Sequence, residues 1–153
     1  MRPHSSFKIL TELLEQRILV LDGAMGTMIQ GKKLSESDFR GERFKNHESD
    51  LSGNNDLLTL TQPHIISKIY LSYLNAGCDI VETNTFNSTG SSQSDYGLSE
   101  ITYELNLEAA KLARSACDET YNNDPQRPRF VAGVLGPTSK TASISPDVND
   151  PAL

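Results

Sequence analysis

The sequence has no long apolar run: no stretch approaches the roughly 20 apolar residues that a bilayer-spanning helix needs. Its first residues do not form the uniformly apolar segment of a secretory signal. Cysteine is also scarce, because Cys78 and Cys117 are the only two and show no paired spacing. This usage is typical of reduced thiols rather than of a disulfide framework. We therefore expect a cytoplasmic protein with no membrane association.

A surplus of basic residues is missing as well. Lys and Arg number 14 against 20 Asp and Glu, which gives a formal net charge of -6, and the basic residues are scattered. Nucleic-acid binding normally needs clustered Lys and Arg, so no nucleic-acid partner is expected. The turn at residues 25–27 lacks the dinucleotide fingerprint and the GK[ST] phosphate loop, and the three histidines have no ligand spacing. These absences favour a small-molecule ligand.

The composition of the 153 residues, 37% hydrophobic and 22% charged, is that of one soluble globular domain. Apolar periodicity predicts a leading helix within 1–17, a helix from Pro63 to Gly77, and a third helix through 98–116. Between and after them, strands are predicted at 18–21, at 79–83 and from Phe130 onward. Strands separated by helices pair in parallel, and near-continuous apolar strands indicate burial on both faces. Either a doubly wound sheet or a barrel would satisfy this α/β pattern.

Two segments stand outside this alternation. Residues 31–62 are polar and glycine-punctuated, and a connection of that length is usually functional or disordered. Residues 139–153 form a polar, proline-containing stretch with no further strand after it. We expect an incomplete domain with an open sheet edge, through which copies of the chain could associate.

Polar side chains follow each predicted strand. Asp22 comes after the first strand, Glu82 and Asn84 end the second, and Thr138 follows the third. In parallel α/β architectures, ligands gather where the strands end. Carboxylates and exposed backbone amides at one edge suit a small zwitterion, so a single shared site is predicted there.

Several motifs resemble the N-terminal part of the homocysteine-binding domain of cobalamin-dependent methionine synthases. They are VLDGAMGTMIQ (20–30), FRGERF (39–44), GNND (53–56), ETNTFNST (82–89), VAGVLGPT (131–138) and TASISPDVNDP (141–151). The resemblance implies a chain that contains the first three β/α units of a (β/α)8 TIM barrel. Residues 1–17 would be the leading helix, 18–138 the three strands with their crossover helices, and 139–153 the loop after the third strand.

The resemblance also implies a methyltransferase that moves a methyl group from methylcobalamin to the sulfur of homocysteine, giving methionine. Zinc would lower the pKa of the homocysteine thiol, which is near 8.5 for a free cysteine-type thiol. The partners would be the remaining barrel strands and the folate, cobalamin and activation modules of such enzymes. The isolated chain is expected to be inactive.

Residue by residue, the family pattern implies a substrate-binding site. Asp22 and Glu82 would lie near the homocysteine ammonium, with the amides around Gly23 and the side chain of Asn84 near its carboxylate. Three further residues would line the same mouth: Thr85, Gly136 and Thr138. No residue of this chain is expected to be catalytic or to bind metal, because the family's three cysteine ligands come from later strands.

Two other interpretations stay open. One is a homocysteine S-methyltransferase that uses a betaine or sulfonium donor without cobalamin. The other is a non-catalytic half-barrel assembly module, which would complete its sheet with a second copy or with a separate chain.

Overall fold

The protein is a helix-rich α/β unit with a small parallel sheet. The computed structural model describes residues 3–138. Its elements, in chain order, are α1 (Pro3–Gln16), α2 (Met25–Gln30), α3 (Glu36–Arg40), η1 (Asn55–Leu57), α4 (Leu58–Thr61), α5 (Pro63–Ala76), β1 (Ile80–Glu82), α6 (Gly90–Gln93), η2 (Ser94–Tyr96), η3 (Ser99–Ile101), α7 (Thr102–Asn123) and β2 (Phe130–Ala132). The predicted 139–153 loop lies outside the described residues.

The sheet is parallel, as predicted. Strand β1 pairs with β2 in the register Ile80 to Phe130. On the other side of β1, Leu21 forms a parallel bridge with Ile80, and the Asp22 N–H donates to the Ile80 carbonyl at 2.9 Å. The first predicted strand is therefore present as a single bridge rather than a full strand. It lies beside β1, and the spatial order is residues 18–22, β1, β2.

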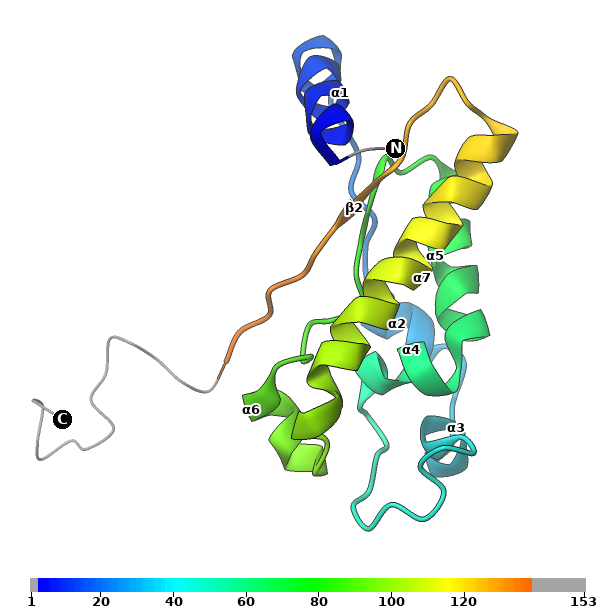
Figure 1. Cartoon of the computed structure of the whole chain (residues 1–153). Helices are drawn as coiled ribbons and strands as arrows, with labels where there is room; N and C mark the ends of the chain where they lie inside the picture. Colours follow the sequence, from blue (N-terminus) through cyan, green and yellow to red (C-terminus); the bar gives the residue numbers. More distant parts are fainter. Residues whose placement is uncertain (1–2, 139–153) are drawn as a thin grey trace, which may run out of the picture.

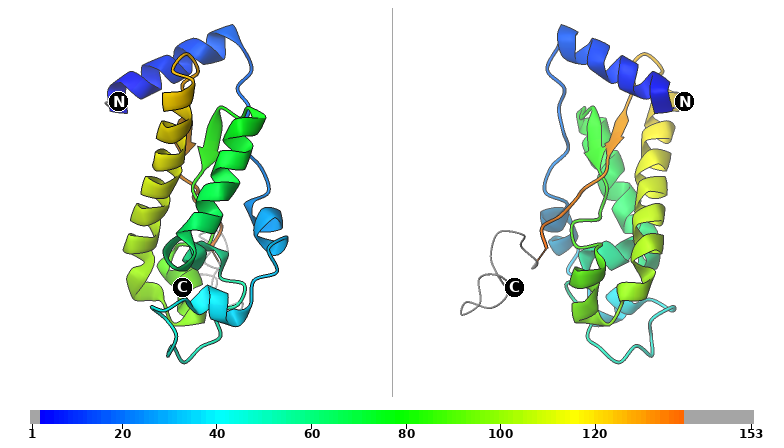
Figure 2. Two further views of the ribbon diagram at one scale, coloured as in Figure 1. Left: turned by 90° about the vertical axis from the view of Figure 1, so that its right-hand side faces the viewer. Right: turned by 60° about the vertical axis from the view of Figure 1, so that its left-hand side comes forward.

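Helices α5 and α7 cover the sheet from one side. They pack against each other, with α5 contacting β1 and α7 contacting β2, and Figures 1 and 2 show both running alongside the strands. Helix α5 begins at Pro63 and ends at Gly77, which has φ 106°, a left-handed conformation that favours glycine. Its fully buried stripe is Ile66, Ile69, Tyr70 and Leu74.

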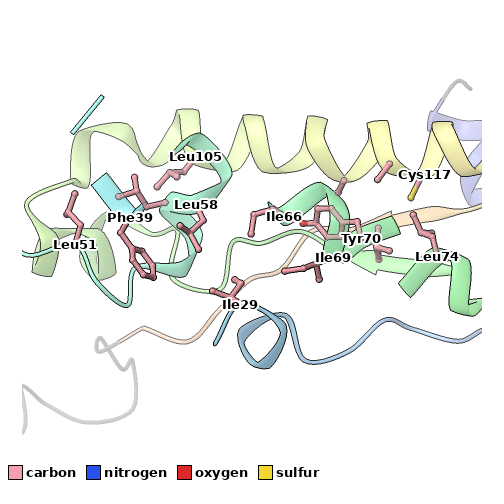
Figure 3. Close-up of a cluster of buried hydrophobic side chains, with 14 of the residues drawn as sticks. Ile29, Phe39, Leu51, Leu58, Ile66, Ile69, Tyr70, Leu74, Leu105 and Cys117 are labelled. Carbon is pink, nitrogen blue, oxygen red and sulfur yellow. The ribbon is translucent and has the colours of Figure 1, made fainter. Parts of the chain in front are cut away.

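The α5 stripe differs slightly from the expected one, because Ile65 and Tyr73 are only half-buried. Helix α7 runs to Asn123, but its predicted first turn is a separate short helix, η3. These buried side chains form one core between the two long helices and the sheet (Figure 3). The core holds β1, and therefore the residues that follow it, in a fixed position.

The prediction that the first strand is buried on both faces is wrong. Ile18 is 88% exposed and Val20 53% exposed, while Leu135 beyond β2 is 99% exposed. Within residues 3–138, α5 and α7 lie on one side of the sheet only, so the opposite face and the two sheet edges have no covering layer. The apolar side chains there face solvent.

The 31–62 segment, which was expected to be a long loop and either functional or disordered, is ordered and packed. It contains α3, η1 and α4, and Leu51, Leu57 and Leu58 are completely buried. Apolar residues at irregular spacing anchor this segment against α5 and α7, which no simple periodicity indicates. Its packing brings Asn55 and Asp56 to the end of the sheet where the strands finish.

The opposite end of the sheet contains a buried ionic cluster. Asp79 directly precedes β1, and its side chain has no exposed surface. Arg17 donates two hydrogen bonds to its carboxylate, both at 2.8 Å, and Arg127 and Arg129 form further ion pairs with it at 3.3 and 3.5 Å. The hydrogen bonds from Arg17 are the main reason that the pKa of Asp79 falls to about 2. The cluster ties the end of α1 to the start of both strands.

No closed barrel is formed by residues 3–138, so membership of a TIM barrel stays a prediction. None of the helices in this range is long and apolar enough to cross a membrane.

Candidate substrate cleft

A cleft of about 390 Å³ opens where the strands end. Its walls come from residues 22–26 after the first strand segment, residues 82–87 at and after β1, Asn55 and Asp56 from η1, and Val134 after β2. Five of the seven predicted binding residues line it: Asp22, Gly23, Glu82, Asn84 and Thr85. The structure thus brings these five together, and their part in ligand binding stays a prediction.

Asp22 is a carboxylate of the cleft whose side chain is held in place by hydrogen bonds. Its two oxygens accept the backbone N–H of Glu82 at 3.1 and 3.2 Å, which fixes the side chain across the end of the sheet. Burial raises the pKa of Asp22 to about 6, and the neighbouring Glu82 charge adds to the rise. A carboxylate that is costly to ionise without a partner favours a cationic ligand group. Glu82 itself is exposed at the rim.

Asn84 is buried, and its amide donors are already engaged. Its Nδ2 donates to the Asn55 carbonyl at 2.9 Å and to the Thr59 hydroxyl at 3.4 Å. Its backbone N–H donates to the Tyr70 hydroxyl at 2.9 Å. With both Nδ2 hydrogens directed into the protein, Asn84 connects the loop after β1 to η1 and α5. A contact with the carboxylate of a ligand would require Asn84 to exchange one of these bonds.

Thr85 is likewise part of the wall. Its hydroxyl donates to the Val134 carbonyl at 3.0 Å and lies 2.7 Å from the Thr83 hydroxyl. The Thr83 hydroxyl in turn accepts the Val134 N–H at 3.0 Å. These two threonines hold the segment beyond β2 against the loop beyond β1. They continue the sheet with side-chain hydrogen bonds after the regular ladder ends.

Gly136 and Thr138 do not line the cleft. A Cβ on Gly136 would overlap the carbonyl oxygen of Phe86, so glycine is needed here because two backbone segments cross closely. Thr138 is an exposed residue farther along the same segment. Gly136 and Thr138 thus lie outside the lining of this cleft, and their part in ligand binding stays a prediction.

Among the cleft residues that were not predicted as site candidates, Asn55 and Asp56 come from a segment far from the strands in the sequence. Both belong to the GNND motif (53–56), which was recognised only as part of the family resemblance. The motif lies in the segment that looked like a loop, so nothing in its periodicity placed it at the strand ends. Its position among the matched motifs was the one signal that could have pointed to the site.

The cleft is acidic. Its lining includes three carboxylates, on Asp22, Asp56 and Glu82, and no Lys, Arg or His from the described part of the chain. An apolar contribution comes from Met25, Phe86 and Val134. Carboxylates beside apolar side chains suit a ligand with an ammonium group and an apolar or thioether-like chain.

The described residues do not fit a catalytic metal. Among residues 3–138, no group of three or more His, Cys, Asp or Glu side chains could hold an ion. Cys78 lies before β1, at the far end from the cleft, and Cys117 lies on α7 with its thiol 3.7 Å from the Phe130 carbonyl. Burial raises the pKa of both thiols to about 11, so neither is a thiolate at neutral pH.

The parallel α/β unit with a cleft at its strand ends has the layout of α/β enzymes, in which ligands gather at the carboxyl ends of the strands. A sequence model of the homocysteine S-methyltransferase family matches residues 19–152. The chain therefore belongs to the homocysteine S-methyltransferase family.

Solved structures support the same assignment. The chain is similar to the homocysteine methyltransferase MmuM from Escherichia coli in its metallated form, with 25% identity and a TM-score of 0.65. For the oxidized form of that enzyme the identity is 26% and the TM-score 0.66. Each match covers 84% of this chain but only 41% and 40% of the solved chain. The chain thus spans about two fifths of the length of the solved structures that it matches.

Proposed function

We propose that the chain provides the amino-acid-binding part of a methyltransferase that methylates the sulfur of homocysteine to give methionine. The observation that carries the proposal is the cleft in which Asp22, fixed by the Glu82 N–H, is left without a cationic partner among the described residues. Family membership supplies the class of reaction. In this assignment Asp22 and Glu82 bind the homocysteine ammonium.

The described residues offer groups that would orient the bound amino acid. Its ammonium faces the two carboxylates, and its side chain extends along Met25, Phe86 and Val134. Gly23 leaves room at the rim, where the nearest atoms to a hypothetical Cβ are 3.9 Å away. Burial of the amino acid at the strand ends would exclude water from its ammonium and strengthen the ion pair.

Thiol activation is not assigned to any residue described here. Zinc serves this purpose in the enzymes that the motifs resemble, but the carboxylates of the cleft and the two buried thiols do not form a suitable donor set. We infer that the metal ligands belong to polypeptide beyond residues 3–138, together with the rest of the TIM barrel. The isolated chain is accordingly predicted to lack methyl-transfer activity.

For the methyl donor we propose methylcobalamin, because the long 39–56 segment and the 142–151 stretch of the sequence favour the resemblance to cobalamin-dependent methionine synthases. A second candidate is an enzyme with a betaine or sulfonium donor, because the family that the chain belongs to is defined by homocysteine S-methylation and not by one donor. Methyl-transfer assays that offer each donor to a complex of this chain with the missing strands would separate the two.

Calorimetric titration of the folded chain with homocysteine tests the proposal. We expect saturable binding without zinc, and no comparable binding of butyric acid, which lacks the ammonium and the thiol. Circular dichroism of the same sample verifies folding. If the folded chain shows no heat of binding with homocysteine up to millimolar concentration, the proposal that this cleft binds homocysteine is wrong.

The uncovered sheet face predicts self-association of the isolated chain. Ile18 and Leu135 are 88% and 99% exposed, and the sheet edges next to them offer unpaired backbone groups. We expect light scattering to give a mass above that of the monomer. The double substitution Ile18→Lys and Leu135→Lys should shift the mass to the monomer, with stability changed by less than about 0.5 kcal/mol. A monomeric wild-type chain would contradict the prediction.

A further inference from the structure

Asp56 is a buried carboxylate whose charge is not paired within the described chain. It lies in η1, is 2% exposed, and takes part in none of the ion pairs formed by residues 3–138. Burying an unpaired carboxylate is costly, and burial raises the pKa of Asp56. Because burying Asp56 beside the cleft lowers the stability of the fold, we expect its hydrogen bonds to have a role in the cleft.

One oxygen of Asp56 anchors the wall of the cleft. Oδ2 accepts the backbone N–H of Asn87 and the hydroxyl of Ser88, each at 2.7 Å. Asn87 lines the cleft next to Phe86. Two short hydrogen bonds to the same carboxyl oxygen fix the positions of both donors. Asp56 therefore ties the 86–88 loop to η1, two segments about 30 residues apart in the sequence.

The same loop is also fixed just before its beginning and within it. Two residues before Phe86, the Asn84 N–H donates to the Tyr70 hydroxyl in the core. Within the loop, the Gln93 amide donates to the Asn87 carbonyl at 3.1 Å and exchanges hydrogen bonds with Asn54. The wall is thus held by buried polar groups from η1, its preceding turn, α5 and α6. Such a wall exists before a ligand arrives, and the ordering cost of binding is reduced.

We propose that Asp56 is the positioning residue of the cleft: it fixes the 86–88 wall in the conformation that receives the amino acid. This inference rests on the proposed function, because it concerns the same cleft. Asp56 acts through Asn87 and Ser88 rather than by touching the reacting sulfur. Losing the anchor should free the wall and weaken binding even in chains that remain folded.

The test compares homocysteine affinities by calorimetry at a temperature where every variant is folded by circular dichroism. Asp56→Ala removes the acceptor for both hydrogen bonds, and we expect the dissociation constant to rise at least about tenfold. Asp56→Asn keeps a carbonyl oxygen that can accept from Asn87 and Ser88, so it should recover part of the lost affinity. Asp95→Ala, at an exposed aspartate outside the cleft, is the matched control and should bind like the wild type.

Ser88→Ala provides a second variant if Asp56→Ala does not fold. It removes one of the two anchors and leaves the carboxylate in place, and we expect a threefold to tenfold loss of affinity, about the effect of one hydrogen bond. Amide hydrogen exchange at Asn87 should accelerate in both variants relative to the amides of α7.

The outcomes separate this inference from the proposed function. If the wild type binds homocysteine and the Asp56 and Ser88 variants bind equally well, the positioning role is wrong and the proposed function stands. If Asp56→Asn loses as much affinity as Asp56→Ala, the charge rather than the anchor matters and the inference is overturned. If the folded wild type binds no homocysteine, the proposed function fails and the positioning role fails with it.

Discussion

Asp22→Asn is expected to weaken homocysteine binding by about tenfold to a hundredfold, the usual contribution of a hydrogen bond to a charged group. Asparagine keeps the shape of the side chain and can still accept the Glu82 N–H, but it cannot neutralise an ammonium. Isothermal titration at pH 7.5 measures the effect. Undiminished affinity in Asp22→Asn would exclude Asp22 from the site.

The same substitution should stabilise the free chain at neutral pH. The pKa of Asp22 is about 6 when folded, against an ordinary value of 3.8, so between these pH values the folded state binds more protons than the unfolded state. The wild-type free energy of unfolding therefore falls as the pH rises from about 4 to about 6, and stays lower above that range. The free energy of unfolding of Asp22→Asn should not fall over this pH range, because asparagine does not titrate. A higher Tm at pH 7 combined with weaker binding is the signature of a residue kept for its ligand.

Proton binding to Asp22 should also appear in the affinity of the wild type. Below the pKa of about 6, the protonated carboxyl no longer offsets the ammonium charge, so the affinity for homocysteine should fall about tenfold per pH unit at sufficiently low pH. The Asp22→Asn variant should show a flatter profile over the same range. Parallel pH profiles for the two proteins would contradict the assigned role.

Asp79→Asn is expected to lower the free energy of unfolding by about 3 to 5 kcal/mol, because removing one partner of a buried ion pair leaves the other charge uncompensated. Here Arg17, Arg127 and Arg129 all pair with the one carboxylate. Two nitrogens of Arg129 are buried without any hydrogen-bond partner in the described structure. Since whole domains are stable by only about 5 to 15 kcal/mol, the variant should be partly unfolded at 37 °C. Urea denaturation followed by circular dichroism measures the loss.

The control for Asp79 is Asp118→Asn, because Asp118 pairs with Arg114 on the exposed face of α7. Exposed pairs contribute about 0 to 1 kcal/mol, so this variant should unfold almost like the wild type. The pH dependence offers a second check. The folded pKa of Asp79, about 2, lies below the ordinary 3.8, so its stabilisation is present above pH 4 and disappears as the pH falls toward 2. Equal stability of the Asp79 and Asp118 variants at pH 7 would show that the cluster contributes little.

The long helices and the parallel pairing were predictable because each depends on local signals. Pro63 and Gly77 mark the ends of α5, and the alternation of helices with apolar strands leaves few topologies other than a parallel sheet. The burial of the first strand was not predictable in the same way. Apolar character says that a side chain would gain from being covered, and residues 3–138 supply a cover on only one face of the sheet.

The same distinction applies to the cleft. Asp22, Glu82 and Asn84 stood out because they lie at or just after the predicted strand ends, and the ends of parallel strands meet at one edge. Thr85 was implied only by the family resemblance. Asn55 and Asp56 gave no such signal, since they lie in an irregular segment about 30 residues away from the loop that they contact. Gly136 was expected to allow a close backbone approach to a ligand; the structure shows a close approach to the Phe86 backbone, and a ligand contact of Gly136 stays a prediction.

The sequence alone determined the homocysteine S-methyltransferase character, the alternation of the long helices with parallel strand segments, and the end of the sheet at which polar groups gather, because these follow from motifs and from local periodicity. The tertiary structure alone decided how those polar groups are used. It directed the Asn84 and Thr85 side chains into the wall, left Asp22 without a cationic partner, and placed Asp56 under the 86–88 loop. Hydrogen bonds between segments distant in the sequence depend on packing, and packing is a property of the folded chain as a whole.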